Sequence, residues 1–579
     1  MDTAIDQKDG MWIEWDVSIT MDDGLVLKAD VFRPLSDGRY PVILTYGPYA
    51  KGLPFQEGYP SCWQKMENEH PDVTQGSSNK YQNWEVVDPE KWVPHDYVCV
   101  RVDSRGCGRS PGYLQHFSPR EINDFYDCIQ WAGVQAWSNG KVGLSGVSYY
   151  AMAQYPVASW QPSHLAAMIS WEGSADWYRD ATHHGGILST FWANWYDMQV
   201  KTIQHGWGER GGVNPNTNEL ISGPVTMSED DLQRNRTDFG SEILNHPLID
   251  YYYKERAPDW DKVKVPMLTA ANWGGQGLHL RGNTEAYVRA ASEEKWLEIH
   301  GIEHWTEFYT DYGVELQRRF LDHFLKGEDN GWDKQPAVQL QVRTLNGFVE
   351  RHEHEWPIAR TNWTRMHLDA DKGVLGDALS TEAKVEYSAT GDGVSFFSEP
   401  LQQDTEITGP SSMKLFISSE TVDADIFVVV RVFSPDDSEV VFQGAIDPHT
   451  PIGQGWLRAS HRKLDEDLST EYRPYHTHDA KQLLVPGEIY ELDIEIWPTS
   501  IVVPAGYRLA VTVRGSDYEY PGDTGGAKLS NFKNELKGCG PFLHDDPRDR
   551  PPSIFGKKVT IYTGGARSSS VLLPIVPGA

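Results

Sequence analysis

The segment KVGLSGVSYYAMAQ, residues 141–154, decides the fold because its character changes in the middle. Its first half is a short apolar run that predicts a buried strand. Its second half, from Tyr149 onward, predicts an apolar helix. Two serines lie in overlapping Gly-x-Ser frames: Ser145 within the predicted strand, and Ser148 where the strand gives way to the helix. A sharp strand-to-helix turn around a serine can expose its hydroxyl group.

Five more segments have the length and apolar composition of buried strands. They are residues 41–49, 95–103, 163–173, 265–273 and 294–301. Residues 119–137, between two of the strands, place apolar side chains near one face of a helix. Strands that alternate with helices predict a parallel sheet with right-handed crossovers. We therefore expect an α/β domain.

The composition changes twice along the chain. Residues 177–260 mix Trp, Tyr, His, Asn and Gly without a strand period, which we interpret as a mainly helical cap over one end of the sheet. After about residue 365, alternating apolar runs are separated by turn residues, which is typical of a β-sandwich. The expected domains are residues 1–176 and 261–365 for the two parts of the α/β domain, 177–260 for the cap, and 366–579 for the β-sandwich.

The 579-residue chain has a net charge of −31 and five cysteines with no Cys-x-x-Cys spacing. Such a charge repels nucleic acid and anionic membranes, so we expect neither as a partner. The odd number of cysteines argues against a disulfide framework or a zinc cluster and fits a cytoplasmic location. We also expect no membrane span and no secretory signal, because no apolar run is long enough and the N-terminus is acidic.

Ser148 has the position that a nucleophile needs, at the end of the predicted strand. Gly146 lies two residues before it, where a small residue permits a tight turn. The position two residues after it is Tyr150, however, so the G-x-S-x-G pattern is incomplete. Because ordinary turns also contain Gly-x-Ser, this pattern alone leaves both a structural and a catalytic role open.

Several segments in the same order resemble the cocaine-esterase-like (CocE/NonD) hydrolases, a family related to the X-Pro dipeptidyl-peptidases. GVSYYA (146–151) resembles the family's G-x-S-Y-x-[GA] elbow, and DSRGCGRSPG (103–112) its D-x-R-G-x-G-x-S-x-G loop. Further matching segments are DGLVLKADVFRP (23–34), GPYAK (47–51), SADWYRD (174–180), FLDHFLKG (320–327) and TGPSSMKLFISSETVDADIFV in the C-terminal part. The resemblance implies an α/β-hydrolase domain with a helical cap insertion and a C-terminal all-β jelly-roll-like domain.

The resemblance also implies a serine hydrolase that forms an acyl-enzyme. Ser148 matches the nucleophile. Tyr49 matches the oxyanion-hole tyrosine, which would act together with the backbone N–H of Tyr149. His304 matches the general base, although one residue fewer separates it from the preceding glycine than in the family's turn. His300 is the competing histidine, but it precedes that glycine and is expected to belong to the strand.

The acid of the triad is missing from its usual place. Family members have an Asp in a G-W-x-D segment, whereas this chain reads NWGG (272–275), with Gly275 in the acid's position. We expect Glu172 to replace it, because Glu172 ends an earlier strand at a position that is apolar in the typical esterase. Some α/β-hydrolases carry their acid on that strand, and the order nucleophile, acid, base is kept. Two alternatives stay open: Asp176 is the acid, or the chain has no competent acid.

The sequence predicts neither a metal nor a cofactor. The histidine-containing segments HHGG and HLRG lack the spacing of metal sites, and TVDADIF lacks the regular oxygen ligands of a calcium loop. The aromatic residues of the cap fit equally well as the wall of a substrate pocket or as the cap's own core. The candidates for the pocket are Trp177, Phe191, Trp192 and Trp195.

The predicted activity is therefore hydrolysis of a small-molecule carboxylic ester, with an amide less favoured. Two alternatives stay open: an acyltransferase or lactone-forming enzyme that uses the same acyl-enzyme, and a catalytically degenerate binding protein. The sequence shows neither the substrate nor the oligomeric state, for which a homodimer is one expectation.

Overall fold

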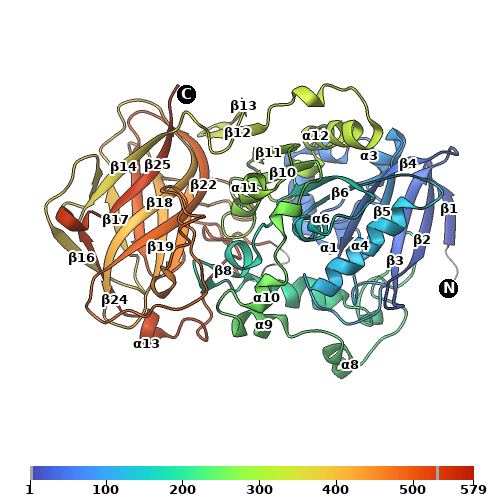
Figure 1. Cartoon of the computed structure of the whole chain (residues 1–579), viewed down its shortest axis with the longest axis horizontal. Coiled ribbons are helices and arrows are strands. Elements are labelled where there is room, and N and C mark those ends of the chain that lie inside the picture. The colour runs from blue at the N-terminus through green and yellow to red at the C-terminus, as the bar shows by residue number, and fades with distance from the viewer. Residues whose placement is uncertain (1–3, 530–531, 533, 579) are drawn as a thin grey trace.

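The computed structural model describes residues 4–529, 532 and 534–578. Two large β-sheets lie toward opposite ends of an elongated molecule (Figure 1). Helices surround the N-terminal sheet, drawn in blue to green, whereas the C-terminal part, drawn in yellow to red, is almost entirely β-structure. The expected α/β part, followed by an all-β part, is thus present.

The N-terminal sheet has eleven strands in the order β1-β2-β3-β5-β4-β6-β7-β10-β11-β12-β13. The strands from β5 to β12 in this order run parallel to one another, and the outer ones are antiparallel. Their bounds are β1 Ala4–Lys8, β2 Met11–Thr20, β3 Val26–Pro34, β4 Tyr40–Gly47, β5 Val98–Asp103, β6 Ser138–Val147, β7 Leu165–Trp171, β10 Met267–Asn272, β11 Lys295–His300, β12 Val338–Thr344 and β13 Gly347–Glu353. All six predicted strands are found, as β4, β5, β6, β7, β10 and β11.

The register of the central strands places the first residues of four loops at one edge of the sheet. Val147 at the end of β6 pairs with Trp171 at the end of β7, which in turn pairs with Ala270 on β10. Asn272 at the end of β10 pairs with His300 at the end of β11. Because the carboxyl ends of parallel strands meet at one edge, the residues that follow these strands lie together there.

Helices cover the sheet and form the cap. The helix predicted over residues 119–137 is α4 (Pro119–Gly133), which begins at Ser118, where the serine side chain accepts a hydrogen bond from Glu121 N–H. The other helices are α1 Phe55–Gly58, α2 Pro60–Glu69, α3 Pro89–Trp92, α5 Tyr149–Met152, α6 Gln154–Ser159, α7 Phe191–Trp195, α8 Glu229–Arg234, α9 Phe239–Asn245, α10 Tyr251–Lys254, α11 Leu280–Arg289, α12 Asp311–Leu321 and α13 Pro552–Phe555. None of the helices in the described part of the chain has the length and apolar character to cross a membrane.

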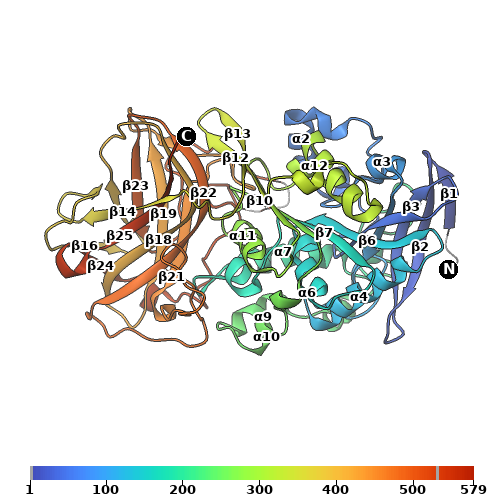
Figure 2. The same ribbon diagram turned by 45° about the horizontal axis from the view of Figure 1, so that its top comes forward.

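The cap consists of short helices and one two-stranded ribbon, β8 (His183–His184) with β9 (Ile187–Leu188). Figure 2 shows α7 beside the N-terminal sheet and α9 and α10 below it. The turn of the ribbon contacts the C-terminal domain so closely that a Cβ on Gly185 would lie 2.0 Å from the carbonyl oxygen of Trp456. The cap is therefore held between the other two parts of the molecule.

The C-terminal sheet has twelve strands, in the part of the chain where alternating apolar runs predicted a β-sandwich. The strands are β14 Asn362–Asp369, β15 Val374–Gly376, β16 Ala383–Ser388, β17 Val394–Phe397, β18 Thr405–Ser419, β19 Asp425–Phe433, β20 Glu439–Val440, β21 Gly453–Arg458, β22 Tyr490–Val503, β23 Arg508–Arg514, β24 Lys558–Thr563 and β25 Ser570–Val576. The residue boundaries expected for the domains stay predictions.

Four buried histidines lie where the cap meets the C-terminal domain. The Nδ1 atoms of His461 and His478 are 3.0 Å apart, and His476 lies beside His478. On the cap side, the ring of His183 stacks on Tyr178 with 4.6 Å between the ring centres. Burial lowers the pKa of each of these histidines below its ordinary value, so all four are neutral in the folded protein.

This cluster predicts that the protein loses stability in mild acid. The unfolded chain binds protons at these histidines below about pH 6.5 while the folded chain does not, so the free energy of unfolding decreases as the pH falls. Each histidine contributes a slope approaching about 1.4 kcal/mol per pH unit below that pH. Urea unfolding between pH 7.5 and 5 measures the slope. His478→Asn, at a φ of 50° that asparagine tolerates, should reduce it by one histidine's share; an unchanged slope would contradict the assignment.

Candidate active site

Ser148 occupies a strained turn between β6 and α5. Its backbone has φ 57° and ψ −116°, a conformation that residues other than glycine rarely adopt. Its N–H donates to the carbonyl of Trp171 at 3.0 Å, which fixes the turn against β7. A Cβ on Gly146 would lie 2.5 Å from the Cβ of Tyr150, so the turn requires a glycine two residues before the serine.

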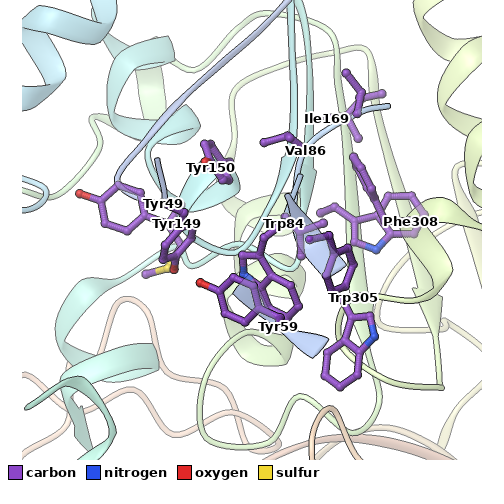
Figure 3. Packing of buried hydrophobic residues seen from close by; sticks show 14 of the residues in the cluster. Tyr49, Tyr59, Trp84, Val86, Tyr149, Tyr150, Ile169, Trp305 and Phe308 are labelled. Carbon is purple, nitrogen blue, oxygen red and sulfur yellow. The ribbon is translucent and has the colours of Figure 1, made fainter. Parts of the chain in front are cut away.

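Glycines also make space for Tyr150, the residue two positions after Ser148. A Cβ on Gly47 would lie 2.6 Å from the ring of Tyr150, so this ring fills the space that Gly47 and Gly146 leave free. Figure 3 shows Tyr49, Tyr149 and Tyr150 grouped at the elbow, and the rings of Tyr49 and Tyr150 meet edge to face at 5.7 Å. Glycines elsewhere thus compensate for the incomplete G-x-S-x-G pattern.

Tyr49 lies two residues after the end of β4 and lines the same cavity as Ser148. Trp195 of the cap donates its indole N–H to the Tyr49 oxygen at 3.0 Å, which leaves the phenol proton free to point elsewhere. Burial raises the pKa of Tyr49 well above its ordinary value, so the phenol stays protonated. The N–H of Tyr149, as the first residue of α5, has no partner within that helix. Both groups are therefore suitable donors to an oxyanion.

The glycine-rich segment that contains Asp103 holds the Tyr49 loop in place. The carboxylate of Asp103 accepts hydrogen bonds from the backbone N–H groups of Lys51 at 2.6 Å and Arg109 at 2.8 Å. The ammonium group of Lys51 is buried against Asp30 at 2.7 Å. The segment is therefore a structural support for the neighbouring loop.

His304 follows β11 and is hydrogen-bonded to Glu172, the residue that follows β7. Nδ1 of His304 lies 2.6 Å from Oε2 of Glu172, and both side chains are buried. Burial alone would raise the pKa of Glu172, but His304 and His300 outweigh it and lower that pKa. Burial likewise opposes the charge on His304, but the carboxylates beside it raise its pKa above the ordinary value. This pair can hold the imidazole in one orientation and stabilise its cation.

Two residues at neighbouring strand ends hold Glu172. Nδ2 of Asn272 donates to the carbonyl of Ile302 at 2.6 Å and lies 3.4 Å from Oε1 of Glu172. Nε2 of His300 lies 3.4 Å from the same oxygen, and its Nδ1 is 2.7 Å from Glu298. His300 therefore supports the carboxylate from behind and does not line the cavity that contains Ser148.

The glycines that replace the family's acid segment have a packing reason. A Cβ on Gly274 would lie 2.3 Å from the Cα of Gly444, in a loop of the C-terminal domain, and a Cβ on Gly275 would lie 3.0 Å from the carbonyl of Asn272. Ala445 in that loop donates its N–H to Gly274 at 3.0 Å and accepts the N–H of His304 at 2.8 Å. The contact with this loop thus leaves no space for a side chain at Gly274, and the backbone of the turn itself leaves little at Gly275.

The alternatives Ser145 and Asp176, and the carboxylate next to His304 in sequence, are engaged elsewhere. The Oγ of Ser145 donates to Gln317 at 3.0 Å inside the core. Asp176 caps the N-terminus of a helical turn and pairs with Arg179. Glu303, next to His304 in sequence, pairs with Lys65 at 2.8 Å.

Ser148 and His304 line a cavity between the sheet, the cap and the C-terminal domain. Of the four cap residues predicted for the pocket, Phe191, Trp192 and Trp195 line it. Trp177 does not, because its ring packs against Phe117 at 4.6 Å and Trp192 at 4.5 Å. The remaining lining residues are Tyr49, Trp84, Glu85, Gln199, Leu278, Trp305, Ile446, Phe532 and Phe542.

Sequence reasoning missed Glu85, whose carboxylate lies 2.8 Å from Nε2 of His304. Glu85 is in the loop before α3, outside any recognised motif, and nothing in its spacing relates it to His304. It also missed the contribution of the C-terminal domain to the cavity wall, through Ile446 and Phe542.

Among the described residues, two groups of side chains have ligand atoms close enough to hold a metal ion. The first group is Glu172, His279 and His304, and the second is Glu69, His70 and Glu303. In the first group, Glu172 and His304 already share a hydrogen bond, and His279 is hydrogen-bonded to the carbonyl of Gly173 at 3.0 Å. In the second, the two carboxylates flank Lys65, which neutralises charge there. Each group therefore has partners of its own.

Comparison with known proteins identifies the class of this chain. Residues 23–306 match the X-Pro dipeptidyl-peptidase (S15) family, and residues 330–572 match the C-terminal non-catalytic domain of the X-Pro dipeptidyl-peptidases. The cocaine esterase of Rhodococcus sp. (strain MB1 Bresler) is 25% identical over 88% of this chain and 92% of its own length. A putative Xaa-Pro dipeptidyl-peptidase of Streptomyces avermitilis is 23% identical over 84% of this chain and 76% of its own.

A crystal structure of a CocE/NonD family hydrolase from Staphylococcus aureus superimposes with a TM-score of 0.82. It is 31% identical and covers 99% of this chain and 96% of its own. The protein is thus an α/β-hydrolase with a C-terminal jelly-roll-like domain, and an enzyme of the serine esterase type. In particular, the chain belongs to the CocE/NonD hydrolase family.

Proposed function

We propose that this hydrolase cleaves carboxylic esters through an acyl-enzyme on Ser148, with His304 as base and Glu172 as the acid of the triad. The hydrogen bond of 2.6 Å between His304 and Glu172 carries the proposal, because it supplies the orienting carboxylate that the usual position lacks. The strained backbone of Ser148, on the adjacent strand end, supports its role as the nucleophile.

The proposed reaction follows from these positions. Oγ of Ser148 attacks the carbonyl carbon while Nε2 of His304 takes the hydroxyl proton. The Tyr49 hydroxyl and the Tyr149 N–H stabilise the oxyanion, and His304 passes its proton to the leaving alkoxide. Water then repeats the sequence on the acyl-enzyme. The aromatic wall favours an ester whose acyl group is apolar.

Labelling with a fluorophosphonate, followed by peptide mapping, tests this proposal. The label should map to Ser148, and p-nitrophenyl acetate should give a burst of one p-nitrophenolate per active site. Product analysis with and without an added alcohol then distinguishes hydrolysis from acyl transfer. No label on the folded protein would refute the proposal in favour of a binding role.

Tyr49→Phe should lower kcat by about 10²–10³-fold, the usual cost of removing one oxyanion donor, with little change in KM. The ring packing on Tyr150 is retained in this variant, but Trp195 loses its acceptor, so a stability loss of about 1–3 kcal/mol is expected with the fold intact. Steady-state kinetics with p-nitrophenyl acetate measures the effect. A rise in KM with kcat unchanged would instead indicate a role in substrate binding.

A further inference from the structure

Glu85 is a buried carboxylate at the nitrogen of His304 that faces away from Glu172. Its Oε1 lies 2.8 Å from Nε2, its side chain is 2% exposed, and it lines the cavity with Ser148. Its other oxygen, Oε2, has no hydrogen-bond partner among the described residues. A buried carboxylate is costly unless it has a partner, and its partner here is the catalytic imidazole.

The chain holds Glu85 in this position from several sides. Its φ of 62° is left-handed, as are those of Ser148 and Glu172, so three strained residues surround His304. Its carbonyl accepts the N–H of Val147, one residue before the nucleophile, at 3.0 Å. The loop is thereby fixed to the elbow itself.

Aromatic packing fixes the same loop to the loop of His304. The ring of Trp84 stacks on Tyr59 with 4.0 Å between ring centres, and it lies 5.7 Å from the ring of Trp305 (Figure 3). Because Trp84 precedes Glu85 and Trp305 follows His304, this contact keeps the carboxylate and the imidazole together.

The position of Glu85 matters because Nε2 is the one nitrogen of the His304 imidazole that is available to Ser148. Nδ1 is occupied by Glu172 at 2.6 Å. Within the described part of the chain, the hydroxyl of Ser148 has no hydrogen bond, whereas Nε2 has its bond to Glu85. The carboxylate and the serine therefore compete for the same nitrogen.

We propose that Glu85 is a second carboxylate partner of His304, which holds a proton on Nε2 in the resting enzyme and sets the pH at which Ser148 can be activated. This inference rests on the proposed function. The resting imidazolium carries one proton toward each carboxylate. It must lose the Nε2 proton to solvent before Nε2 can take the proton of Ser148 and pass it to the leaving group.

The charged and titratable groups around this pair are few. Glu172 and His300 face His304 from the strand ends, and the neutral ring of His279 stacks on it at 5.1 Å. Around Glu85 lie four tyrosines whose pKa values are raised by burial, so they stay neutral: Tyr49, Tyr59, Tyr150 and Tyr309. Burial raises the pKa of Glu85, and His304 opposes that effect.

Two opposite effects follow from this arrangement. Where Glu85 is ionised and the pH lies below the pKa of His304, the carboxylate keeps His304 protonated, so a smaller fraction of the enzyme is active. At high pH the same carboxylate makes the neutral imidazole a stronger base and stabilises the cation that forms in the transition state. A residue with only a structural role would lower activity equally at all pH values.

The test is the pH dependence of kcat/KM for the wild type and Glu85→Gln. The acidic limb should move to lower pH by about one to two units, the usual effect of removing an adjacent charge. The variant should be faster than the wild type below this limb and slower at high pH, so that the two profiles cross. Profiles that stay parallel would overturn the proposal.

Two further variants complete the design. Glu85→Asp keeps the charge and should restore part of the wild-type profile. Glu303→Gln is the matched control, because Glu303 is also buried and adjoins His304 in sequence but pairs with Lys65, and it should leave the limb in place.

A measurement that does not depend on turnover separates this proposal from the proposed function. The proton between His304 and Glu172 should give a downfield NMR resonance whose titration follows His304 directly. A lower His304 pKa in Glu85→Gln supports the role of Glu85 even if no fluorophosphonate label reaches Ser148. An unchanged titration overturns that role even if Ser148 is labelled.

Discussion

Replacing Ser148 with alanine should lower kcat by about 10⁶-fold, because the nucleophile and the base act as a unit and removing either abolishes the covalent route. The cavity walls and the oxyanion donors would remain, so substrate binding should change little. Some residual acceleration over water is expected from those donors. Steady-state hydrolysis of p-nitrophenyl acetate measures the loss, with the burst amplitude as a second readout.

Ser145→Ala is the matched control for this prediction. Its hydroxyl lies three residues earlier and is bonded to Gln317 at 3.0 Å, away from the cavity. Its loss should cost about 1 kcal/mol of stability, the net value of one hydrogen bond, and leave turnover intact. Equal loss of activity in both variants would contradict the assignment of Ser148.

The sheet could be predicted from sequence because its strands are short, apolar and flanked by turn residues. Each of the six predicted strands contains β-branched or aromatic residues in a run that is too short for a typical helix. Parallel strands place their ends at one edge, so Ser148 and His304 could be assigned to one site from chain order and resemblance. Such assignments need only local patterns and topology.

The contact of Glu172 with His304 could be predicted because one carboxylate was missing and another was present at a neighbouring strand end. The physical reason for the loss was not visible in the sequence. At Gly275, the acid's position, a Cβ would lie 3.0 Å from the carbonyl of Asn272 and 3.3 Å from the nitrogen of Leu280. The contact with Gly444, 170 positions away in another domain, restricts the neighbouring Gly274. Neither the backbone geometry of this turn nor the domain contact beside it leaves a periodic pattern along the chain.

Glu85 and Trp177 show where sequence reasoning fails. Glu85 reaches His304 from an irregular loop whose position depends on the stacking of Trp84 with Tyr59 and its contact with Trp305. Trp177 and Trp195 look alike in sequence, but only Trp195 donates to Tyr49. Irregular loops and a cap of short helices give no period from which the direction of a side chain can be inferred.

Glu172→Gln should lower kcat by about 10⁴-fold, the effect of replacing the acid of a serine protease triad by its amide. The glutamine keeps the size of the side chain but removes the charge that stabilises the imidazolium. It also can present an N–H to Nδ1, which favours the tautomer that carries its proton on Nε2 and cannot accept from Ser148. Turnover and the rate of fluorophosphonate labelling should fall together.

Adding Gly275→Asp to Glu172→Gln tests whether the acid is free to return to the family's usual position. No recovery is expected, because a Cβ at residue 275 would lie 3.0 Å from the carbonyl of Asn272 and 3.3 Å from the nitrogen of Leu280. Recovery would mean that this turn is more adaptable than its packing suggests. Unimpaired turnover of Glu172→Gln alone would instead show that His304 needs no carboxylate on Nδ1. The role of Glu172 would then be limited to its contacts with His300 and Asn272.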